Sequence, residues 1–507
     1  MPQDPEATLK RVSDYMRETR IMQSISALLD WDQQTGMPEA GAAWRSRQSE
    51  WLAGCIHRRQ TDPRLGEWLS ELSGTRLASD PHAVSGSTIR VLKHNFDKKS
   101  RLPEALVREQ AAAHSLGQQV WVKARQTGNF DLFAPHLEKI VDLKREEAQA
   151  TRQPGQCLYD PLLDDFEPGA DTRAVHQVLT RLGQHLTPLM NRLDPAQTDR
   201  SAILRKHYPR AGQERITRQA AAAFGFDFQR GRQDTAAHPF CTELGPADIR
   251  MTTRFDERFL SSALFGTLHE TGHGLYEQGL PEEHYGLPAG SYCSLGIHES
   301  QSRLWENLVG RSHGFWRHFL PTLATEFPAA VGDTPLDRFH AAVNEIRPSL
   351  IRVEADEVTY NLHIVIRVEL EIALLDGDLQ VGDLPGAWSE LYRKYLGLVP
   401  DSAATGVLQD IHWSAGLFGY FATYTLGNLY ASQLFARANA DLGNLDEAFA
   451  RGEFAPLLEW LRHKIHGRGA CLPSAALMQE VTGSAIDQQP LLDHLNRKVS
   501  SLYSATS

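Results

Sequence analysis

Apolar positions along the chain recur mostly at the spacing of an α-helix. After the turn-like sequence EPGADT, one helix face is formed by Val175, Val178, Leu179, Leu182 and Leu186. Asp171 or Thr172 is a suitable N-cap for that helix. Similar apolar stripes occur in 102–124, 136–152, 336–351, 358–375 and 385–396. The pattern therefore predicts a mainly α protein.

Two segments depart from this pattern. Residues 238–255, HPFCTELGPADIRMTTRF, alternate polar with β-branched residues around an LGPAD turn, which predicts a hairpin and hence one small sheet. Residues 411–436 are the most apolar part of the chain but contain several glycines and amides, so we expect a buried helix there and no membrane span.

No fixed repeat, low-complexity stretch or long linker divides the chain. We therefore expect one domain over residues 1–507. Within it we expect an N-terminal helical lobe of about 1–235 and a second part of about 236–507.

Composition narrows the class of protein. A hydrophobic content of 41% with 23% charged residues is ordinary for a folded globular chain. The net charge of −11 disfavours binding to nucleic acid or to an anionic membrane surface. Five scattered cysteines without a C-x-x-C pair favour reduced thiols, and the polar, acidic start does not resemble a secretory signal. We therefore expect a cytoplasmic protein.

The sequence HETGH at 269–273 carries the main candidate chemistry. Two residues four apart share one helix face, so His269 and His273 can present ring nitrogens to one ion. Glu270 projects from the next position and can act as general base on a water bound to zinc. Because such a short motif also arises by chance, there is an alternative. The two histidines could be exposed to solvent, or buried in the core with hydrogen-bond partners, without binding a metal.

A catalytic zinc site of this type needs a third protein ligand. Glu299, 26 residues after His273, lies in a segment that also has helical character, and we assign it this role. Glu277 follows on the motif's own helix and is poorly placed to complete a tetrahedron, and Glu306 is interpreted as a surface charge. His298 points about 100° away from Glu299 on a helix, so we expect it to support a ligand or to contact substrate.

These stretches belong to a larger set that resembles the carboxypeptidase Taq family. The set, in the family's order, is DIRMT at 248–252, HETGH at 269–273, HESQ at 298–301, IRVEAD at 351–356 and GVLQDIHW at 406–413. The stretches LLDWDQQTGMP at 28–38 and YDPLLDDFEPG at 159–169 also look like that family, so the resemblance spans nearly the whole chain.

The resemblance implies a metal-dependent exopeptidase that removes single residues from a free peptide C-terminus. It implies a mostly helical fold, with two lobes around a deep substrate groove, similar to angiotensin-converting enzyme and neurolysin. It assigns His269, His273 and Glu299 to the metal and Glu270 to general-base catalysis. It also implies a homodimer. We expect the metal to be zinc or alternatively cobalt, which nitrogen and oxygen ligands accept with similar geometry.

The terminal carboxylate of a peptide is best held by an arginine, whose planar guanidinium donates two parallel hydrogen bonds. The family pattern favours Arg352 over Arg250 and Arg303. The alternative for Arg352 is an ion pair with Asp356 or another acid. We expect Arg250 and Asp248 to order the predicted hairpin.

The developing oxyanion needs a donor besides the metal. By analogy with related two-lobed peptidases, we expect His412 and Tyr420 to line the substrate end, with Asp410 or Gln409 orienting their neighbours. The alternative for Tyr420 is a core aromatic.

Together these observations predict a cytoplasmic zinc carboxypeptidase of broad specificity, in which Glu270 assists attack by a zinc-bound water. Two alternatives stay open. The same site could release dipeptides or cleave internally, depending on where the carboxylate is held. An inactive peptide-binding protein is the other, and the intact Glu270 argues against it.

Overall fold

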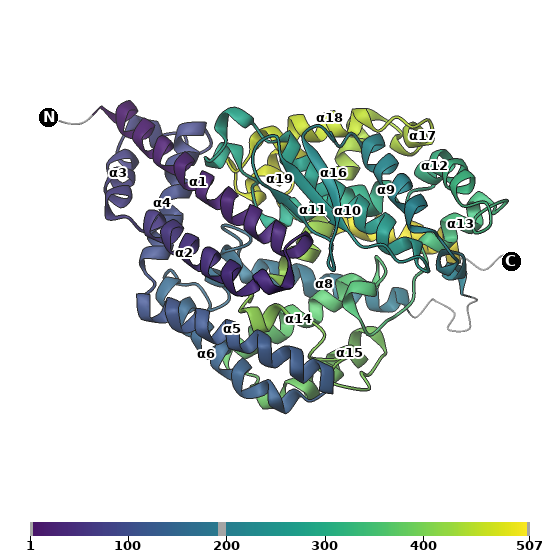
Figure 1. Cartoon of the computed structure of the whole chain (residues 1–507), viewed down its shortest axis with the longest axis horizontal. Helices are drawn as coiled ribbons and strands as arrows, with labels where there is room; N and C mark the ends of the chain where they lie inside the picture. The colour runs from purple at the N-terminus through teal and green to yellow at the C-terminus, as the bar shows by residue number, and fades with distance from the viewer. Residues whose placement is uncertain (1–3, 191–198, 504–507) are drawn as a thin grey trace. The chain divides into compact units, whose positions relative to one another are not determined.

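The computed structural model describes residues 4–190 and 199–503, and helices dominate it (Figure 1). The chain divides into two compact units, each assembled from three stretches of sequence. Unit 1 contains the described residues of Met1–Ser100, Asp199–Val343 and Leu434–Ala485, and unit 2 those of Arg101–Thr198, Asn344–Gln433 and Ile486–Ser507. The boundary expected near residue 235 is not a junction between these stretches, and the single-domain assignment stays a prediction.

Three of the first four helices of unit 1 pack through an apolar core. This core joins Val12 of the first helix to Leu69 and Ile89 of the third and fourth. The helices of unit 1 are α1 (Pro5–Thr35), α2 (Ala42–Gln60), α3 (Pro63–Ser73), α4 (Val84–Ser100), α9 (Arg210–Phe224), α10 (Leu260–Gly279), α11 (Leu295–Arg303), α12 (His313–Glu326), α13 (Leu336–Val343), α17 (Leu445–Ala450), α18 (Ala455–Lys464) and α19 (Ser474–Thr482).

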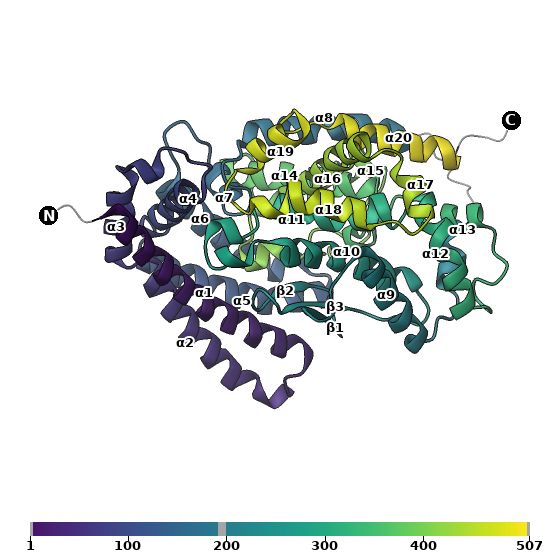
Figure 2. The ribbon, with the colours of Figure 1, turned by 90° about the horizontal axis from the view of Figure 1, so that it is seen from above.

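A three-stranded sheet, with order β1-β3-β2, lies in unit 1 beside α10 (Figure 2). Strands β2 (Cys241–Glu243) and β3 (Ile249–Thr253) are antiparallel, and the Leu244 N–H donates to the Asp248 carbonyl across their turn at 2.9 Å. The predicted hairpin is therefore confirmed. Strand β1 (Gly231–Thr235) pairs in parallel with β3 and was not predicted, because its sequence GRQDT is polar throughout.

Helices α10 and α11 pack so closely that only a glycine fits at one position of their contact. A Cβ at Gly272 would lie 2.5 Å from the Gln301 carbonyl oxygen and 2.6 Å from Ser302 Cα. A glycine that looks like a weak point for helix formation thus permits backbone contact between the two helices. Ser294 caps α11 by accepting a hydrogen bond from the Ile297 N–H at 3.0 Å.

In the described part of unit 2 the elements of regular secondary structure are helices. Its helices are α5 (Glu104–Thr127), α6 (Ala134–Thr151), α7 (Asp160–Asp164), α8 (Thr172–Met190), α14 (Thr359–Asp376), α15 (Leu384–Leu396) and α20 (Gln489–Tyr503), and α16 (Phe421–Leu442) begins in it. The Asp171 carboxylate accepts a hydrogen bond from the Ala174 N–H at 2.9 Å, so Asp171 is the residue that caps α8.

Two predicted helices differ in extent from the observed ones. The helix expected over 336–351 ends at Val343. Pro348 lacks an amide hydrogen and disfavours helical backbone at the residue before it, and so opposes a helix that continues to 351. The helix expected over 411–436 starts only at Phe421, after Gly416 and Gly419 take positive φ angles of 70° and 89°. Across the described residues, none of the helices combines the length and apolarity that crossing a bilayer requires.

Candidate active site

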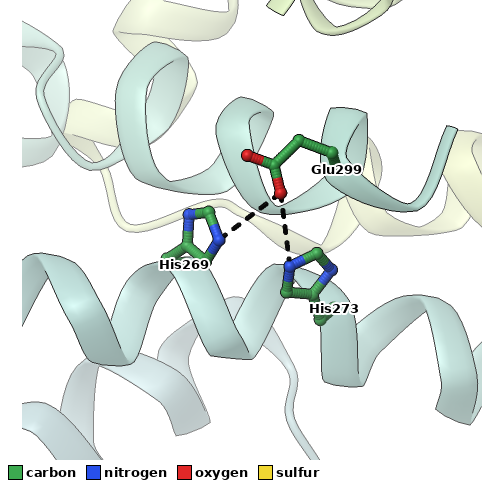
Figure 3. Close-up of side chains that lie close together, drawn as sticks. All are labelled: His269, His273 and Glu299. Atoms are coloured by element: carbon green, nitrogen blue, oxygen red, sulfur yellow. Dashed lines mark ion pairs between the residues drawn. The ribbon is translucent and has the colours of Figure 1, made fainter. Parts of the chain in front are cut away.

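Three side chains of unit 1 bring metal-binding atoms together. His269 and His273 project from α10, and Glu299 projects from α11 toward both of them (Figure 3). Oε2 of Glu299 lies 3.6 Å from Nε2 of His269 and 3.5 Å from Nε2 of His273. One donor atom from each residue lies within 4.8 Å of the others.

This donor set fits a zinc-like ion. Nitrogen and carboxylate ligands about 2.0–2.1 Å from a tetrahedral ion lie roughly 3.4 Å from one another. The distances of 3.5 and 3.6 Å from Glu299 to the two rings are close to that value. The histidine side chains keep 20% and 15% of their surface exposed, which leaves access for a further ligand.

Glu306 holds the far side of the His269 ring. Its Oε2 lies 3.0 Å from Nδ1 of His269, so a proton on Nδ1 leaves the Nε2 lone pair directed at Glu299. Burial opposes a proton on His269, but the carboxylates of Glu299 and Glu306 outweigh it and raise the pKa of His269. Glu306 is buried, at 9% exposure, so its interpretation as a surface charge is wrong.

A chain of hydrogen bonds supports the His273 ring. Nδ1 of His298 lies 2.5 Å from Nδ1 of His273, and Nε2 of His298 lies 2.9 Å from Oε1 of Glu277. Burial, and then His298, lower the pKa of His273 to about 3, which keeps its ring neutral at ordinary pH. His298 therefore lies behind His273, on the side of the ring that faces away from Glu299.

Arg303 fixes the orientation of Glu299. Its Nε donates to Oε1 of Glu299 at 2.7 Å, so the other oxygen faces the histidines. Burial disfavours the charged carboxylate, but Arg303 and His269 outweigh it and hold the pKa of Glu299 well below its usual range. Arg303 also donates to Oε2 of Glu306 at 3.4 Å, and Arg311 donates to Oε1 at 3.2 Å. Arg303 is thus engaged by carboxylates of the cluster.

Glu270 lies one position after His269 and is buried, with 7% of its surface exposed. Burial is the main cause that raises the pKa of its carboxyl to about 7. A carboxyl group with that pKa can accept a proton near neutral pH and release it again.

A second polar cluster, in unit 2, centres on Asp410. Nε of Arg352 donates to Oδ1 of Asp410 at 2.9 Å, and Nη1 of Arg352 donates to the Tyr360 hydroxyl at 3.1 Å. Nε of Arg367 donates to Oδ2 at 2.7 Å. Arg352 is 6% exposed and Arg367 is fully buried. The acid that pairs with Arg352 is therefore Asp410, and the carboxylate clamp stays a prediction.

His412 and Tyr420 neighbour one another close to this cluster. Their ring centroids are 5.4 Å apart, and Nε2 of His412 lies 3.2 Å from the Tyr424 hydroxyl. Burial lowers the pKa of His412 to about 3, so its ring is neutral. The Tyr420 ring also packs edge-on against Phe166 at 5.0 Å.

The other residues flagged from sequence make local structural contacts. Arg250 forms a two-point ion pair with Asp248, at 2.8 and 2.7 Å, inside the hairpin. Asp356 lies just before α14, and its carboxylate accepts from the Val358 N–H at 2.9 Å and the Thr359 N–H at 3.0 Å.

The structure thus groups the flagged residues by unit. His269, Glu270, His273, His298 and Glu299 lie in unit 1, whereas the residues assigned to substrate, Arg352, His412 and Tyr420, lie in unit 2 with Asp410. Sequence reasoning missed the role of Glu306, although Glu299, Arg303 and Glu306 recur at i, i+4 and i+7 and so mark one helix face. It also missed Arg367, which no motif marks.

Comparisons with known proteins agree over nearly the full length. The family model for carboxypeptidase Taq (M32) metallopeptidase matches residues 11–499. Thermostable carboxypeptidase 1 of Thermus thermophilus is 46% identical, with 98% of this chain and 99% of that protein covered. Carboxypeptidase 1 of Bacillus subtilis is 35% identical, with 98% and 97% covered. The M32 carboxypeptidase structure from Deinococcus radiodurans R1 matches with a TM-score of 0.94 at 36% identity, covering 98% of this chain and 100% of that one.

Proposed function

Because the chain belongs to the carboxypeptidase Taq (M32) family and is a metallocarboxypeptidase, we propose that it removes single residues from the free C-terminus of peptides, with broad side-chain tolerance. The observation that carries this proposal is the convergence of His269, His273 and Glu299 beside the buried carboxyl of Glu270. A protein that only binds peptides would not need a buried carboxylic acid next to the three metal donors.

We assign the metal to Nε2 of His269, Nε2 of His273 and Oε2 of Glu299, and we propose zinc, with cobalt as the alternative. When bound, such an ion polarises the scissile carbonyl and lowers the pKa of a coordinated water. The surrounding side chains prepare the donors for it. Glu306 and His298 hold the two rings from behind, and Arg303 turns one Glu299 oxygen away.

Glu270 is the proposed general base. It takes the proton of the attacking water on its carboxylate and delivers that proton to the leaving amine, since the same group can act as acid once protonated. Its pKa of about 7 keeps both forms accessible near neutral pH. No other side chain within the HETGH segment, apart from the two histidines, carries an acid–base group.

The Asp410 cluster is the proposed binding region for the substrate end. Arg352 supplies positive charge for the terminal carboxylate, and Asp410 and Gln409 hold its guanidinium and main chain in place, the latter at 2.9 Å from the Arg352 nitrogen. His412 and Tyr420 supply donors for substrate oxygens. Release of dipeptides is the alternative outcome of this arrangement.

We also propose that the enzyme works in the cytoplasm as a homodimer on peptide substrates. All five cysteines are free thiols, which suits a reducing compartment. The dimer rests on the resemblance to the family.

The direct test is mass spectrometry of an N-blocked tetrapeptide incubated with the zinc-loaded protein and with a chelator-treated control. We expect stepwise loss of one C-terminal residue, abolished by the chelator. Loss of two residues per step would establish the dipeptidyl alternative. An intact peptide despite one bound zinc per chain would favour the binding-protein alternative.

A further inference from the structure

A buried histidine outside every recognised motif contacts the metal-binding helices of unit 1. His466 lies in a short turn, η11 (His466–Arg468), that follows α18, and none of its surface is exposed. Its Nε2 lies 3.0 Å from Oε1 of Gln301. Burial lowers the pKa of His466 to about 3, so the ring is neutral and carries one N–H.

The direction of the bond between these two side chains follows from the neighbours of Gln301. Nε2 of Gln301 donates to the Ser300 hydroxyl at 3.0 Å, which leaves its oxygen facing His466. The ring therefore donates from Nε2, and Nδ1 carries no proton. Within the described residues, Nδ1 has no hydrogen-bond partner. The ring thus makes one polar contact, with Gln301 of α11, which lies two residues after Glu299.

The same ring lies against the end of α10. A Cβ at Gly279, the last residue of α10, would overlap Nδ1 of His466, so the ring fills the space that this glycine leaves. The ring also packs on Tyr276 with centroids 5.0 Å apart. His466 therefore touches both helices that carry the metal donors.

The segment around His466 is itself fixed to the loop that joins α10 to α11. The Ala470 N–H donates to the Pro288 carbonyl at 2.9 Å, and the Cys293 thiol donates to the Leu472 carbonyl at 3.0 Å. The position of His466 is thus supported by the segment that follows it, which is bonded to this loop at two points.

We propose that His466 is a positioning residue that sets the spacing between α10 and α11, and with it the distance from Glu299 to the two histidines. The inference rests on the proposed metal site and goes beyond it. An apolar side chain would fill the same space without burying an imidazole and an amide, each of which costs free energy unless hydrogen-bonded. The hydrogen bond between His466 and Gln301 is explained if it holds Gln301 in place. Gln301 in turn fixes the turn of α11 that carries Glu299.

The test is the zinc dissociation constant, measured by competition with a chromophoric chelator, for His466→Leu, Gln301→Leu and the double variant. Loss of residues that support metal ligands typically weakens metal binding 10- to 100-fold, and we expect about 10-fold for each single variant. The double variant should be no weaker than either single one, because both remove the same bond. Gly279→Ala displaces the ring without removing it and should also weaken zinc binding.

Tyr208→Phe is the matched control. It removes a buried hydrogen bond of unit 1, from the Tyr208 hydroxyl to the Ile203 carbonyl at 2.7 Å, and should lower thermal stability while leaving the zinc dissociation constant unchanged. Wild-type zinc affinity in His466→Leu, or a loss that Tyr208→Phe reproduces, overturns the inference. If His466→Leu does not fold, Gln301→Leu and Gly279→Ala decide by the same criterion. Failure of the wild-type chain to bind zinc would instead overturn the proposed function.

Discussion

Glu270 is the residue at which metal binding and catalysis can be separated. Glu270→Gln keeps the shape of the side chain but cannot accept a proton. Because its carboxylate is not among the three metal donors, we expect one zinc per chain as in the wild type. Activity should fall by about 10²–10⁴-fold, as is typical for loss of a general base. Zinc content by mass spectrometry together with kcat/KM checks this, and joint loss of metal and activity would make Glu270 a ligand.

Arg352 and Arg367 share one carboxylate, which makes them a matched pair. If Arg352 holds the substrate's terminal carboxylate, Arg352→Gln should lower kcat/KM for free C-termini by about 10- to 100-fold, the range for a lost charged hydrogen bond. Amidated peptides should change little. Arg367→Gln removes the fully buried partner of Asp410 and should reduce stability while keeping the preference for free C-termini. If Arg352→Gln kept the wild-type preference for free over amidated C-termini, Arg352 would not be the residue that holds the terminal carboxylate.

Residue roles could be predicted from the sequence where they depend on spacing within one helix. The four-residue separation of His269 and His273 fixes a shared face before any tertiary contact forms. Glu306 was misread because its burial depends on how the π-helical segment Leu304–Val309, which follows α11, packs beside α10, and local spacing does not encode that packing. The bond from His298 to His273 likewise joins two helices, so its partner could not be read from the motif.

Among elements, the backbone contact of α10 with α11 is the feature that brings the donors together. Gly272→Ala would force a Cβ into Gln301 and Ser302. We expect a loss of about 1–3 kcal/mol in the free energy of unfolding, as for other overpacked sites, together with weaker zinc binding. Chemical denaturation and zinc titration measure the two effects.

Gly386 provides the control, because it lies in α15 and a Cβ there meets nothing within 4 Å. Gly386→Ala should raise stability by up to about 1 kcal/mol, the ordinary helix-propensity gain. A similar gain for Gly272→Ala would show that α10 and α11 do not need their close approach.

Glu371 of α14 ties three segments of unit 2 together, and its burial predicts that the stability of this unit depends on pH. Its carboxyl accepts from the Tyr159 hydroxyl at 2.8 Å, the Trp413 indole at 2.9 Å and the Gly419 N–H at 3.1 Å. Burial nevertheless raises the pKa of Glu371 from 4.5 to about 7. The folded chain therefore holds this proton at pH values where the unfolded chain releases it.

The resulting stabilisation is complete below a pH of about 4.5 and is lost as the pH rises through about 7, with a total of about 3 kcal/mol. Glu371→Gln has no such proton. We therefore expect the stability of the wild type relative to Glu371→Gln to fall between pH 5 and pH 8. Thermal unfolding of both proteins across this range checks the sign, and parallel curves would contradict the buried protonated carboxyl.

Elements were predictable from sequence to the extent that local patterns specify them. Alternation around LGPAD specified β2 and β3, but the polar strand β1 depends on its partner β3 for its conformation. The apolar stripe over 336–351 continued past Val343, although the helix ends there and Pro348 follows. Periodicity locates a buried face, whereas breaks in the backbone decide where the helix ends.

For the whole molecule, the division of roles follows the two units. All three proposed metal donors lie between residues 269 and 299, and the residues that support them, His466 included, also lie in unit 1. The residues assigned to the substrate end lie in unit 2, between residues 352 and 420. A mutation in either unit can therefore abolish peptide hydrolysis for different reasons, which zinc affinity distinguishes.

Removing zinc should accordingly loosen one unit before the other. A ligand that binds only the folded state stabilises it by about 4 kcal/mol at a thousandfold excess over its dissociation constant. Because the donors lie on α10 and α11, we expect chelation to raise amide hydrogen exchange in these helices and in η11, while α14 and α15 of unit 2 keep their protection. Hydrogen exchange followed by mass spectrometry, with and without chelator, measures this. Equal loss of protection in α14 would mean that the two units open as one cooperative body, and zinc would then stabilise the whole chain.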